Sequence, residues 1–315
     1  MRLKKIELGG LEIPNNLFLA PLAGYTNAVF RAMCLKLGAG LTFTEMVSAK
    51  GLCYNSENTR ELLKLTPYYG AVNAVQLFGS DPEFMRRAAC GEELAPFELI
   101  DINMGCPVPK IYKNGEGSAL LNDIPLAQKL VRAAKSSGKK VSVKFRTGVD
   151  GEHIVTRDFA VAMRDAGADM LTVHGRTRAQ MYSGAVDYDQ IAAAKKAVDC
   201  PVIANGGVFS AADADRLISL TGADGVMIAR GAMYDPFLFA VIAGVEVPDK
   251  KAAIASQIED TFAAYDYRFA TVFMRKMLSF YIKGQAGAAA TRVKLMGANS
   301  KEEIEDILDG LEFNG

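Results

Sequence analysis

The chain has 315 residues, of which 36 are basic and 36 acidic, so its formal net charge is zero. Half of the residues are apolar and 23% are charged, which is typical of a packed globular protein and excludes a disordered one. The zero balance also excludes a uniformly basic coat for nucleic acid, although a local basic patch remains compatible with it. The length suits one α/β barrel of ~250 residues with an appended domain.

The N-terminal region predicts neither a membrane span nor a secretory signal. The uncharged stretch 13–30 is interrupted by Pro14, Pro21 and Gly24, and no basic, apolar and small-residue succession opens the chain. The five cysteines form no C-x-x-C pair and are accompanied by only two histidines, which offers little for a zinc site. We expect a cytoplasmic protein without structural metal, and we expect it to be a monomer.

Eight short apolar runs of strand character alternate with helical segments. Several of the runs are apolar on both faces, as parallel strands covered by helices are. Glycine-containing joints at 38–40, 167–169 and 222–224 each lead from a helix into a strand, and glycine there can adopt the left-handed conformation that ends a helix. The expected strands are 17–19, 41–45, 74–78, 99–103, 141–145, 170–174, 202–205 and 226–229.

Eight such units predict a TIM (β/α)8 barrel, with a doubly wound open sheet as the alternative. The open sheet of dinucleotide-binding proteins carries G-x-G-x-x-G after its first strand, whereas this chain reads APLAGY at 20–25, which favours the barrel. We expect the barrel to occupy residues 1–244.

The strand signals stop after residue 244. Residues 244–249 have the composition of a linker, and apolar residues from Ile254 to Phe280 recur with a helical period. A further helix is expected over 301–308, where Ser300 can cap the N-terminus. Residues 245–315 are therefore expected to form a small all-α domain.

Polar or otherwise unusual residues follow nearly every expected strand. In a parallel barrel these positions meet at the carboxyl-terminal rim, where barrel enzymes have their active sites. Each residue alone has an ordinary structural explanation, and it is their coincidence at one rim that indicates a site. They are Pro21, Leu22, Ala23, Glu45, Gln76, Asn103, Cys106, Lys144, Arg146, His174, Arg176, Asn205, Gly206, Gly207, Arg230 and Gly231.

Two of these loops favour a phosphate site. Asn205-Gly206-Gly207 follows the seventh strand, and the loop at 229–231 follows the eighth, which is where barrels often bind phosphate. Glycines let backbone N–H groups converge on an anion, and Arg230 can add a bidentate contact. Simple turn chemistry is the alternative for the Asn-Gly pair.

Two cations are predicted to point into the barrel. Lys144 and Arg146 alternate with Val143 and Phe145, so they face inward if the two apolar residues face the helices. Burial of both charges is costly unless an anion or an electron-rich ligand compensates. Lys144 alone could instead form a Schiff base, as in barrel lyases.

The remaining rim residues suggest proton transfer and recognition of a ring. Cys106 lies on a glycine-containing loop past the fourth strand, and a thiol with an ordinary pKa of ~8.5 is protonated at neutral pH and can act as a general acid. Gln76 and Asn103 carry amides that both donate and accept, which suits the edges of a heteroaromatic ring such as a flavin. His174 could donate a hydrogen bond or be purely structural.

The ordered motifs resemble those of the tRNA-dihydrouridine synthases, flavin enzymes with an FMN-binding barrel and a C-terminal helical domain. The resemblance extends from Ala20 to Ala298. Where members often carry His and Trp, this chain has Met277 and Phe280. The motifs are APLAGYTNAVFR (20–31), VQLFGSDP (75–82), DINMGCPVPKIYKNGEGSALL (101–121), VKFRTG (143–148), VHGRTRAQMYSG (173–184), IANGGV (203–208) and RKMLSFYIKGQAGAAATR (275–292).

The resemblance implies reduction of the C5–C6 double bond of a tRNA uridine, in the D-loop. Hydride would come from FMN reduced by NADPH or NADH, and Cys106 would protonate C5. The implied FMN contacts are Pro21, Leu22, Ala23, Gln76, Lys144, His174, Asn205, Gly206, Gly207, Ala229 and Arg230. The implied substrate contacts are Asn103, Arg146, Arg178, Arg275 and Lys276.

A basic segment in the helical part favours an RNA partner. Between Tyr265 and Ala298 there are six basic residues and one acidic residue, and such a patch would bind phosphates in a salt-dependent manner. A solvated helix face is the alternative explanation.

Three other functions are compatible with parts of the sequence. A flavin barrel acting on a free pyrimidine would leave the helical domain and its basic segment without a role. A Schiff-base lyase using Lys144 would leave Gln76 and Cys106 unexplained. A catalytically silent tRNA-binding protein would not need Cys106, Lys144 and His174 together.

Overall fold

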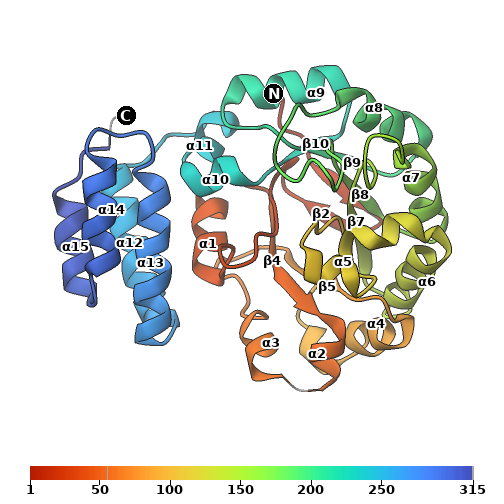
Figure 1. The fold of residues 1–315 in the computed structure, drawn as a ribbon, viewed down its shortest axis with the longest axis horizontal. Helices are drawn as coiled ribbons and strands as arrows, with labels where there is room; N and C mark the ends of the chain where they lie inside the picture. Colours follow the sequence, from red (N-terminus) through yellow and green to blue (C-terminus); the bar gives the residue numbers. More distant parts are fainter. Residues whose placement is uncertain (55, 314–315) are drawn as a thin grey trace.

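Eight parallel strands form a closed barrel in the computed structural model, which describes residues 1–54 and 56–313 (Figure 1). The strands pair in chain order, and the last closes the circle against the first. The predicted barrel and its eight strands are confirmed, and the open sheet is excluded. The strands are β3 (Leu17–Leu19), β4 (Leu41–Ser48), β5 (Asn73–Phe78), β6 (Leu99–Met104), β7 (Lys140–Arg146), β8 (Met170–His174), β9 (Val202–Asn205) and β10 (Gly225–Ile228).

Helices surround the barrel (Figure 1). Gly38, Gly167 and Gly222 have φ angles of 104°, 104° and 64°, so the left-handed joints between helix and strand are confirmed. Among the described residues, no helix is both long enough and apolar enough to cross a membrane. The helices are α1 (Ala28–Lys36), α2 (Ala49–Cys53), α3 (Glu57–Glu61), α4 (Pro82–Ala89), η1 (Glu92–Leu94), α5 (Pro109–Lys113), η2 (Gly117–Asn122), α6 (Ile124–Lys135), α7 (Thr156–Asp165), α8 (Tyr188–Ala197), α9 (Ala211–Thr221), α10 (Arg230–Tyr234) and α11 (Leu238–Ala243).

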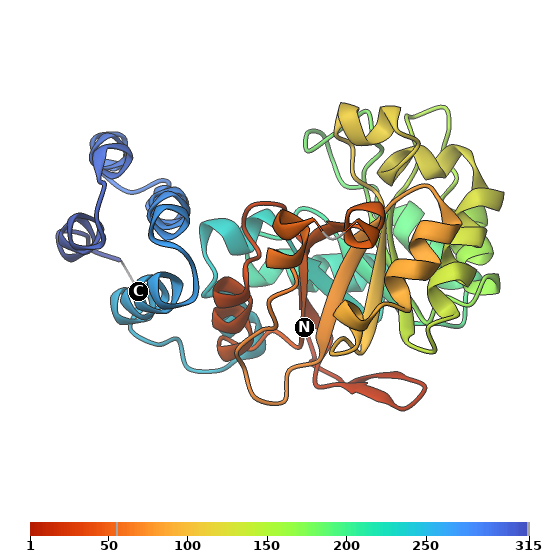
Figure 2. The same ribbon diagram turned by 90° about the horizontal axis from the view of Figure 1, so that it is seen from below.

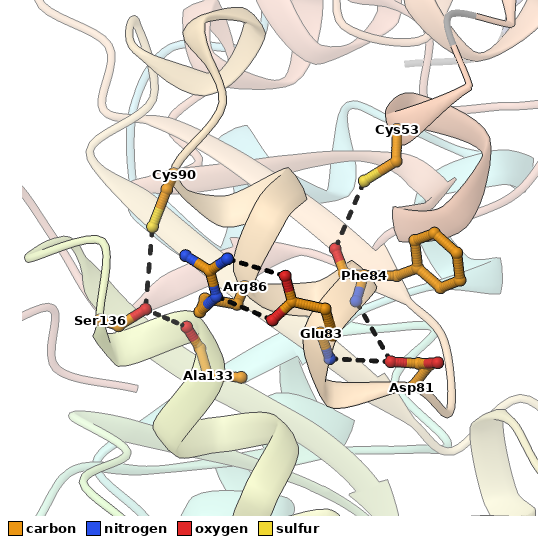
Figure 3. Close-up of polar contacts among 8 residues, drawn as sticks. All are labelled: Cys53, Asp81, Glu83, Phe84, Arg86, Cys90, Ala133 and Ser136. Atoms are coloured by element: carbon orange, nitrogen blue, oxygen red, sulfur yellow. Dashed lines mark hydrogen bonds and ion pairs between the residues drawn. The ribbon is translucent and has the colours of Figure 1, made fainter.

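Helix α4 shows how the outer helices are fixed to one another (Figure 3). The side chain of Asp81 accepts a hydrogen bond from the backbone N–H of Phe84 at 3.3 Å and caps the helix. The Cys53 thiol, at the end of α2, donates to the Phe84 carbonyl at 3.6 Å, and Cys90 Sγ lies 3.7 Å from Ser136 Oγ after α6. These two cysteines therefore connect neighbouring helices on the outside of the barrel.

A hairpin that the sequence pattern does not reveal closes the amino-terminal end of the barrel. Strands β1 (Ile6–Leu8) and β2 (Leu11–Ile13) pair antiparallel, and Figure 2 shows them projecting beneath the barrel. Ile6, Leu8 and Ile13 belong to the apolar cluster inside the barrel, together with Phe18 of β3. Each strand has only three residues, which is too short for an alternating pattern to stand out.

Four helices follow the barrel and pack as a bundle beside it (Figures 1 and 2). The apolar face expected from Ile254 to Phe280 is divided between two helices, because Asp266 accepts from the backbone N–H of Phe269 and starts a new one. Ser300 caps the last helix as predicted. The bundle consists of α12 (Lys250–Ala264), α13 (Tyr267–Tyr281), α14 (Ala288–Gly297) and α15 (Lys301–Asp309).

Shortening a buried side chain of the hairpin should destabilise the barrel. Ile13 is fully buried, so we expect Ile13→Ala to lower the free energy of unfolding by ~2–5 kcal/mol, measured by urea denaturation. Leu220 on α9 is 54% exposed, and Leu220→Ala is the matched control, with an expected change within ~0.5 kcal/mol. Equal losses in the two variants would show that the hairpin adds nothing to the barrel core.

Candidate functional site

All but one of the rim residues predicted from the sequence line one cavity at the carboxyl ends of the strands. The exception is Glu45, whose carboxylate accepts from the backbone N–H of Gly24 instead. The volume of the cavity is about 450 Å³, within the range of ~300–1,000 Å³ common for small-molecule sites. The barrel thus brings together positions that are far apart in the chain. The predicted residues that line the cavity are Pro21, Leu22, Ala23, Gln76, Asn103, Cys106, Lys144, Arg146, His174, Asn205, Gly206, Gly207, Ala229 and Arg230.

The alternation along β7 determines which side chains reach this cavity. Val143 and Phe145 are fully buried in the core between the barrel and its helices, and the ring of Phe145 packs 5.0 Å from that of Phe159 on α7. Lys144 and Arg146 consequently face inward and line the cavity. The condition set by the sequence pattern is met.

A buried carboxylate lies among these inward-facing residues. Asp101 is fully buried on β6, and its two oxygens accept from Gln76 Nε2 and from Ser142 Oγ, each at 2.6 Å. Burial raises the pKa of Asp101 to about 6, although both hydrogen bonds and the charge of Lys144 act in the opposite direction. Because an ionised carboxylate only accepts, it orients the Gln76 amide with its nitrogen toward Asp101.

This orientation is transmitted to the loop that carries Cys106. Gln76 Oε1 accepts from Asn103 Nδ2 at 2.9 Å. Asn103 Oδ1 then accepts from the backbone N–H groups of Gly105 and Cys106, at 3.2 and 2.9 Å. Asp101 was not among the predicted site residues; its signal in the sequence is a carboxylate at an inward position between Leu99 and Asn103 of an apolar strand.

The Cys106 thiol is partly buried at the wall of the cavity. Its backbone carbonyl accepts from the Ser118 hydroxyl at 2.8 Å, and a Cβ added to Gly117 would lie 2.9 Å from Cys106 Cβ, so η2 packs closely against the loop. Burial raises the pKa of the thiol, while a hydrogen bond from Val108 and the charges of Arg146 and Lys144 oppose this. Cys106 is therefore protonated at neutral pH, as predicted for a general acid.

Four cations face the cavity: Lys144, Arg146, Arg176 and Arg230. Within the described ranges, none of them lies within ion-pair distance of a carboxylate. Lys144 Nζ donates to Asn205 Oδ1 at 3.1 Å, and burial together with the charge of Arg146 lowers the pKa of Lys144 to about 8. The site thus holds an excess of positive charge in a poorly solvated place, which favours binding of an anion.

Burial, together with this excess of positive charge, keeps His174 neutral. Burial and then the charges of Lys144 and Arg146 hold its pKa well below the ordinary value for histidine. A neutral imidazole has one donor and one acceptor nitrogen, so His174 can take part in hydrogen bonding with a ligand without adding a further charge.

The three arginines hold one loop through successive carbonyl oxygens. Arg146 Nη1 donates to Met181 O at 2.8 Å, Arg230 Nη2 donates to Tyr182 O at 3.2 Å, and Arg176 Nη2 donates to Gly184 O at 2.8 Å. Arg176 Nη1 is buried and has no partner among the described residues. The sequence pattern predicts Arg176 at the rim without indicating a role; its two-residue spacing from His174 is the signal that it faces inward.

The loops that follow β9 and β10 contain glycines at positions where a side chain would meet neighbouring atoms. Gly206 and Gly207 have φ angles of 131° and 72°, and a Cβ on Gly206 would lie 3.1 Å from the His174 ring. A Cβ on Gly231 would lie 2.3 Å from the Val208 carbonyl oxygen. Gly206, Gly207 and Gly231 also line the cavity, and a phosphate cradle uses backbone N–H groups at such glycines.

Three predicted substrate contacts lie outside the cavity. The guanidinium of Arg178 stacks over Tyr112 at 3.7 Å. Arg275 Nη1 donates to Ala298 O at 3.0 Å, at the end of α14, and Lys276 Nζ donates to the carbonyl oxygen of Gly24. Asn103 and Arg146, the other two predicted contacts, line the cavity beside Cys106.

The sequence is similar to a family of known enzymes over nearly its whole length. The family model described as dihydrouridine synthase (Dus) matches residues 18–312. The tRNA-dihydrouridine synthase B of Pasteurella multocida (strain Pm70) is 35% identical, covering 89% of this chain and 87% of that protein. A probable tRNA-dihydrouridine synthase 1 of Synechocystis sp. is 36% identical, covering 97% of this chain and 89% of that protein.

Solved structures with a similar fold are more distant in sequence. Histamine dehydrogenase from Rhizobium sp. 4-9 superposes with a TM-score of 0.59 at 15% identity, over 81% of this chain and 50% of that chain. Morphinone reductase gives a TM-score of 0.57 at 15% identity, over 79% and 91% of the two chains. These structural similarities show the barrel fold alone. The sequence matches show the family: the chain belongs to the dihydrouridine synthase family and is an enzyme of the flavin-dependent oxidoreductase class.

Proposed function

We propose that this protein reduces the C5–C6 double bond of a D-loop uridine in tRNA to 5,6-dihydrouridine, with FMN in the rim cavity. One observation carries the proposal: the thiol of Cys106 faces the same cavity as four cations for which the described part of the chain supplies no carboxylate partner. A flavin phosphate and an electron-rich ring would supply the missing negative charge. Membership in the dihydrouridine synthase family supports uridine as the target.

The residues present fit FMN. The cradle at Gly206 and Gly207, with Arg230 beside it, suits the phosphate. Gln76, whose amide is oriented by Asp101, offers hydrogen bonds to a ring edge, and Lys144 offers a positive charge to it. We also assign the implied contacts of Pro21, Leu22, Ala23, His174, Asn205 and Ala229 to the cofactor, since all of them line the cavity.

In the proposed reaction the cofactor supplies the hydride and the Cys106 thiol supplies the proton. When bound, FMN would supply a hydride to C6 of the uracil ring after its own reduction by NADPH or NADH. Cys106 donates its proton to C5, and the resulting thiolate regains a proton from water, so that hydride and proton together saturate the bond. Asn103 and Arg146 both bond to the loop that carries Cys106 and would hold the base, which must leave its stack to enter the cavity.

We assign the tRNA contacts outside the cavity to the barrel rim and the helical bundle, in a cytoplasmic monomer. Arg268 and Lys294 are exposed on α13 and α14, and Lys283 lies over the Tyr234 ring at 3.9 Å. Arg178 and Arg275 remain proposed substrate contacts by resemblance, although each guanidinium already has an intramolecular partner.

The role of Cys106 can be tested with purified protein. We expect Cys106→Ala to retain FMN and to oxidise NADPH, but to lose ~10²–10⁴-fold in the rate of dihydrouridine formation, because protonation of carbon then lacks a positioned acid. Dihydrouridine is measured in tRNA isolated from a strain lacking the protein. Cys90→Ala removes an exposed thiol outside the cavity and should keep the full rate; a Cys106→Ala variant that matched it would refute the assignment.

The affinity for FMN should depend on pH through Lys144. An anion favours the protonated lysine, so binding raises its pKa above the value of about 8 in the free protein. Affinity is therefore full below pH 8 and falls as the pH rises through that value, by up to about tenfold per unit. Fluorescence quenching of FMN from about pH 6 to pH 9.5 measures it.

Two variants isolate the cause of this pH dependence. Asp101→Asn removes a negative charge that raises the pKa of Lys144, so the decline should begin at a lower pH than in the wild type. Lys144→Arg stays charged over the whole range and should show no decline. A wild-type affinity that does not change with pH would contradict the position assigned to Lys144.

A further inference from the structure

The loop that follows β3 connects the cofactor cavity with the helical bundle. This loop, residues 20–28, lines the cavity through Pro21, Leu22, Ala23 and Tyr25 and then enters α1. On its other side it contacts the bundle formed by α12–α15. The loop therefore links the candidate cofactor site to a domain whose expected task is to bind RNA.

Both backbone polar groups of one residue in this loop, Gly24, are held from opposite sides, one from the barrel and one from the bundle. The N–H of Gly24 donates to the carboxylate of Glu45, and the carbonyl oxygen of Gly24 accepts from Lys276 Nζ on α13. Glu45 lies where the register between β4 and β5 shifts, between Phe43 and Met46, and such a bulge redirects side chains at a barrel rim. The barrel and the bundle thus hold Gly24 between an anion and a cation.

Two further contacts from the bundle reach the same loop. The Tyr265 hydroxyl accepts from the backbone N–H of Ala28 at 3.0 Å, where α1 begins. The ring of Tyr25 meets that of Phe280 edge to face at 5.5 Å and lies 4.3 Å from Lys276 Nζ. The bundle therefore contacts the loop at three residues: Gly24, Tyr25 and Ala28.

The Lys276 ammonium group already has protein partners, unlike that of a lysine free to bind phosphate. Its side chain is half-buried, and burial lowers its pKa while the charge of Glu45 opposes that shift. A lysine that contacts RNA keeps its ammonium hydrated until it meets a phosphate. To reach a phosphate, Lys276 would have to release both Gly24 and the Tyr25 ring.

We propose that Lys276 is a positioning residue that holds the cofactor loop in place against Glu45, and that it is not a contact for tRNA phosphate. This inference rests on the proposed function for the identity of FMN, and it replaces the substrate contact that the family resemblance implies for Lys276. The helical bundle then contributes to the flavin site even when no RNA is bound.

The clamp itself can be tested without cofactor or RNA. In Lys276→Met, amide hydrogen exchange in the peptide covering residues 20–28 should be faster than in the wild type, because the Gly24 carbonyl loses its donor. Lys294→Met removes the same charge from an exposed position on α14 and should leave that peptide unchanged. Lys276→Arg retains a donor and should restore slow exchange.

The consequence for the cofactor is measured as a dissociation constant without RNA. We expect Lys276→Met to raise the Kd for FMN about tenfold, the loss typical of a hydrogen bond to a charged donor. Lys294→Met should stay within about twofold of the wild type. If Lys276→Met fails to fold, Glu45→Met removes the acceptor of the Gly24 N–H from the barrel side and should also accelerate exchange in residues 20–28.

The results separate the possible failures. Unchanged exchange and an unchanged FMN Kd in Lys276→Met, with a raised KM for tRNA, would make Lys276 an RNA contact and overturn the inference. Unchanged exchange in Glu45→Met would overturn it as well. A wild-type protein that binds no FMN, but in which Lys276→Met still accelerates exchange in the loop, would refute the proposed function and leave the clamp established.

Discussion

The hydrogen bonds of one buried carboxylate organise the cavity. Asp101 is removed from water, and such a charge persists only where its oxygens are satisfied. Gln76 and Ser142 satisfy them, and the requirement leaves the Gln76 amide a single favourable orientation. Asn103 must follow, and its oxygen receives the N–H of Cys106. The placement of the thiol is thus a consequence of a charge buried within the barrel.

The cations above Asp101 outnumber it, and this imbalance explains how the cavity meets its ligands. Arg146, Arg176 and Arg230 lower their own cost of burial by donating to carbonyl oxygens of the loop at 181–184. Because a carbonyl oxygen carries no net charge, these hydrogen bonds are weaker than those to an anion. An anionic ligand can compete for the same donors, so that binding and the conformation of this loop are coupled in free energy.

The sequence predicts what depends on local pattern. Apolar runs and glycine joints locate the strands and helix ends, and closure of the barrel then brings strand ends such as Gln76, Lys144 and Asn205 to one rim. Asp101 escaped prediction because a carboxylate inside a strand gives no sign of its partners on β5 and β7. The contact of Lys276 was hidden for the same reason: its acceptor, Gly24, lies at the other end of the chain.

The number of basic residues in the helical segment overstates how many of them are free to bind RNA phosphates. Arg275 and Arg292 donate to carbonyl oxygens within the bundle, and Lys276 donates to the barrel. Basic residues with these partners stabilise contacts between helices or domains, and to bind phosphate they would first have to break bonds that the fold uses. The bundle therefore contacts the loop at 20–28, which lines the cavity, through aromatic packing as well as through the charge of Lys276.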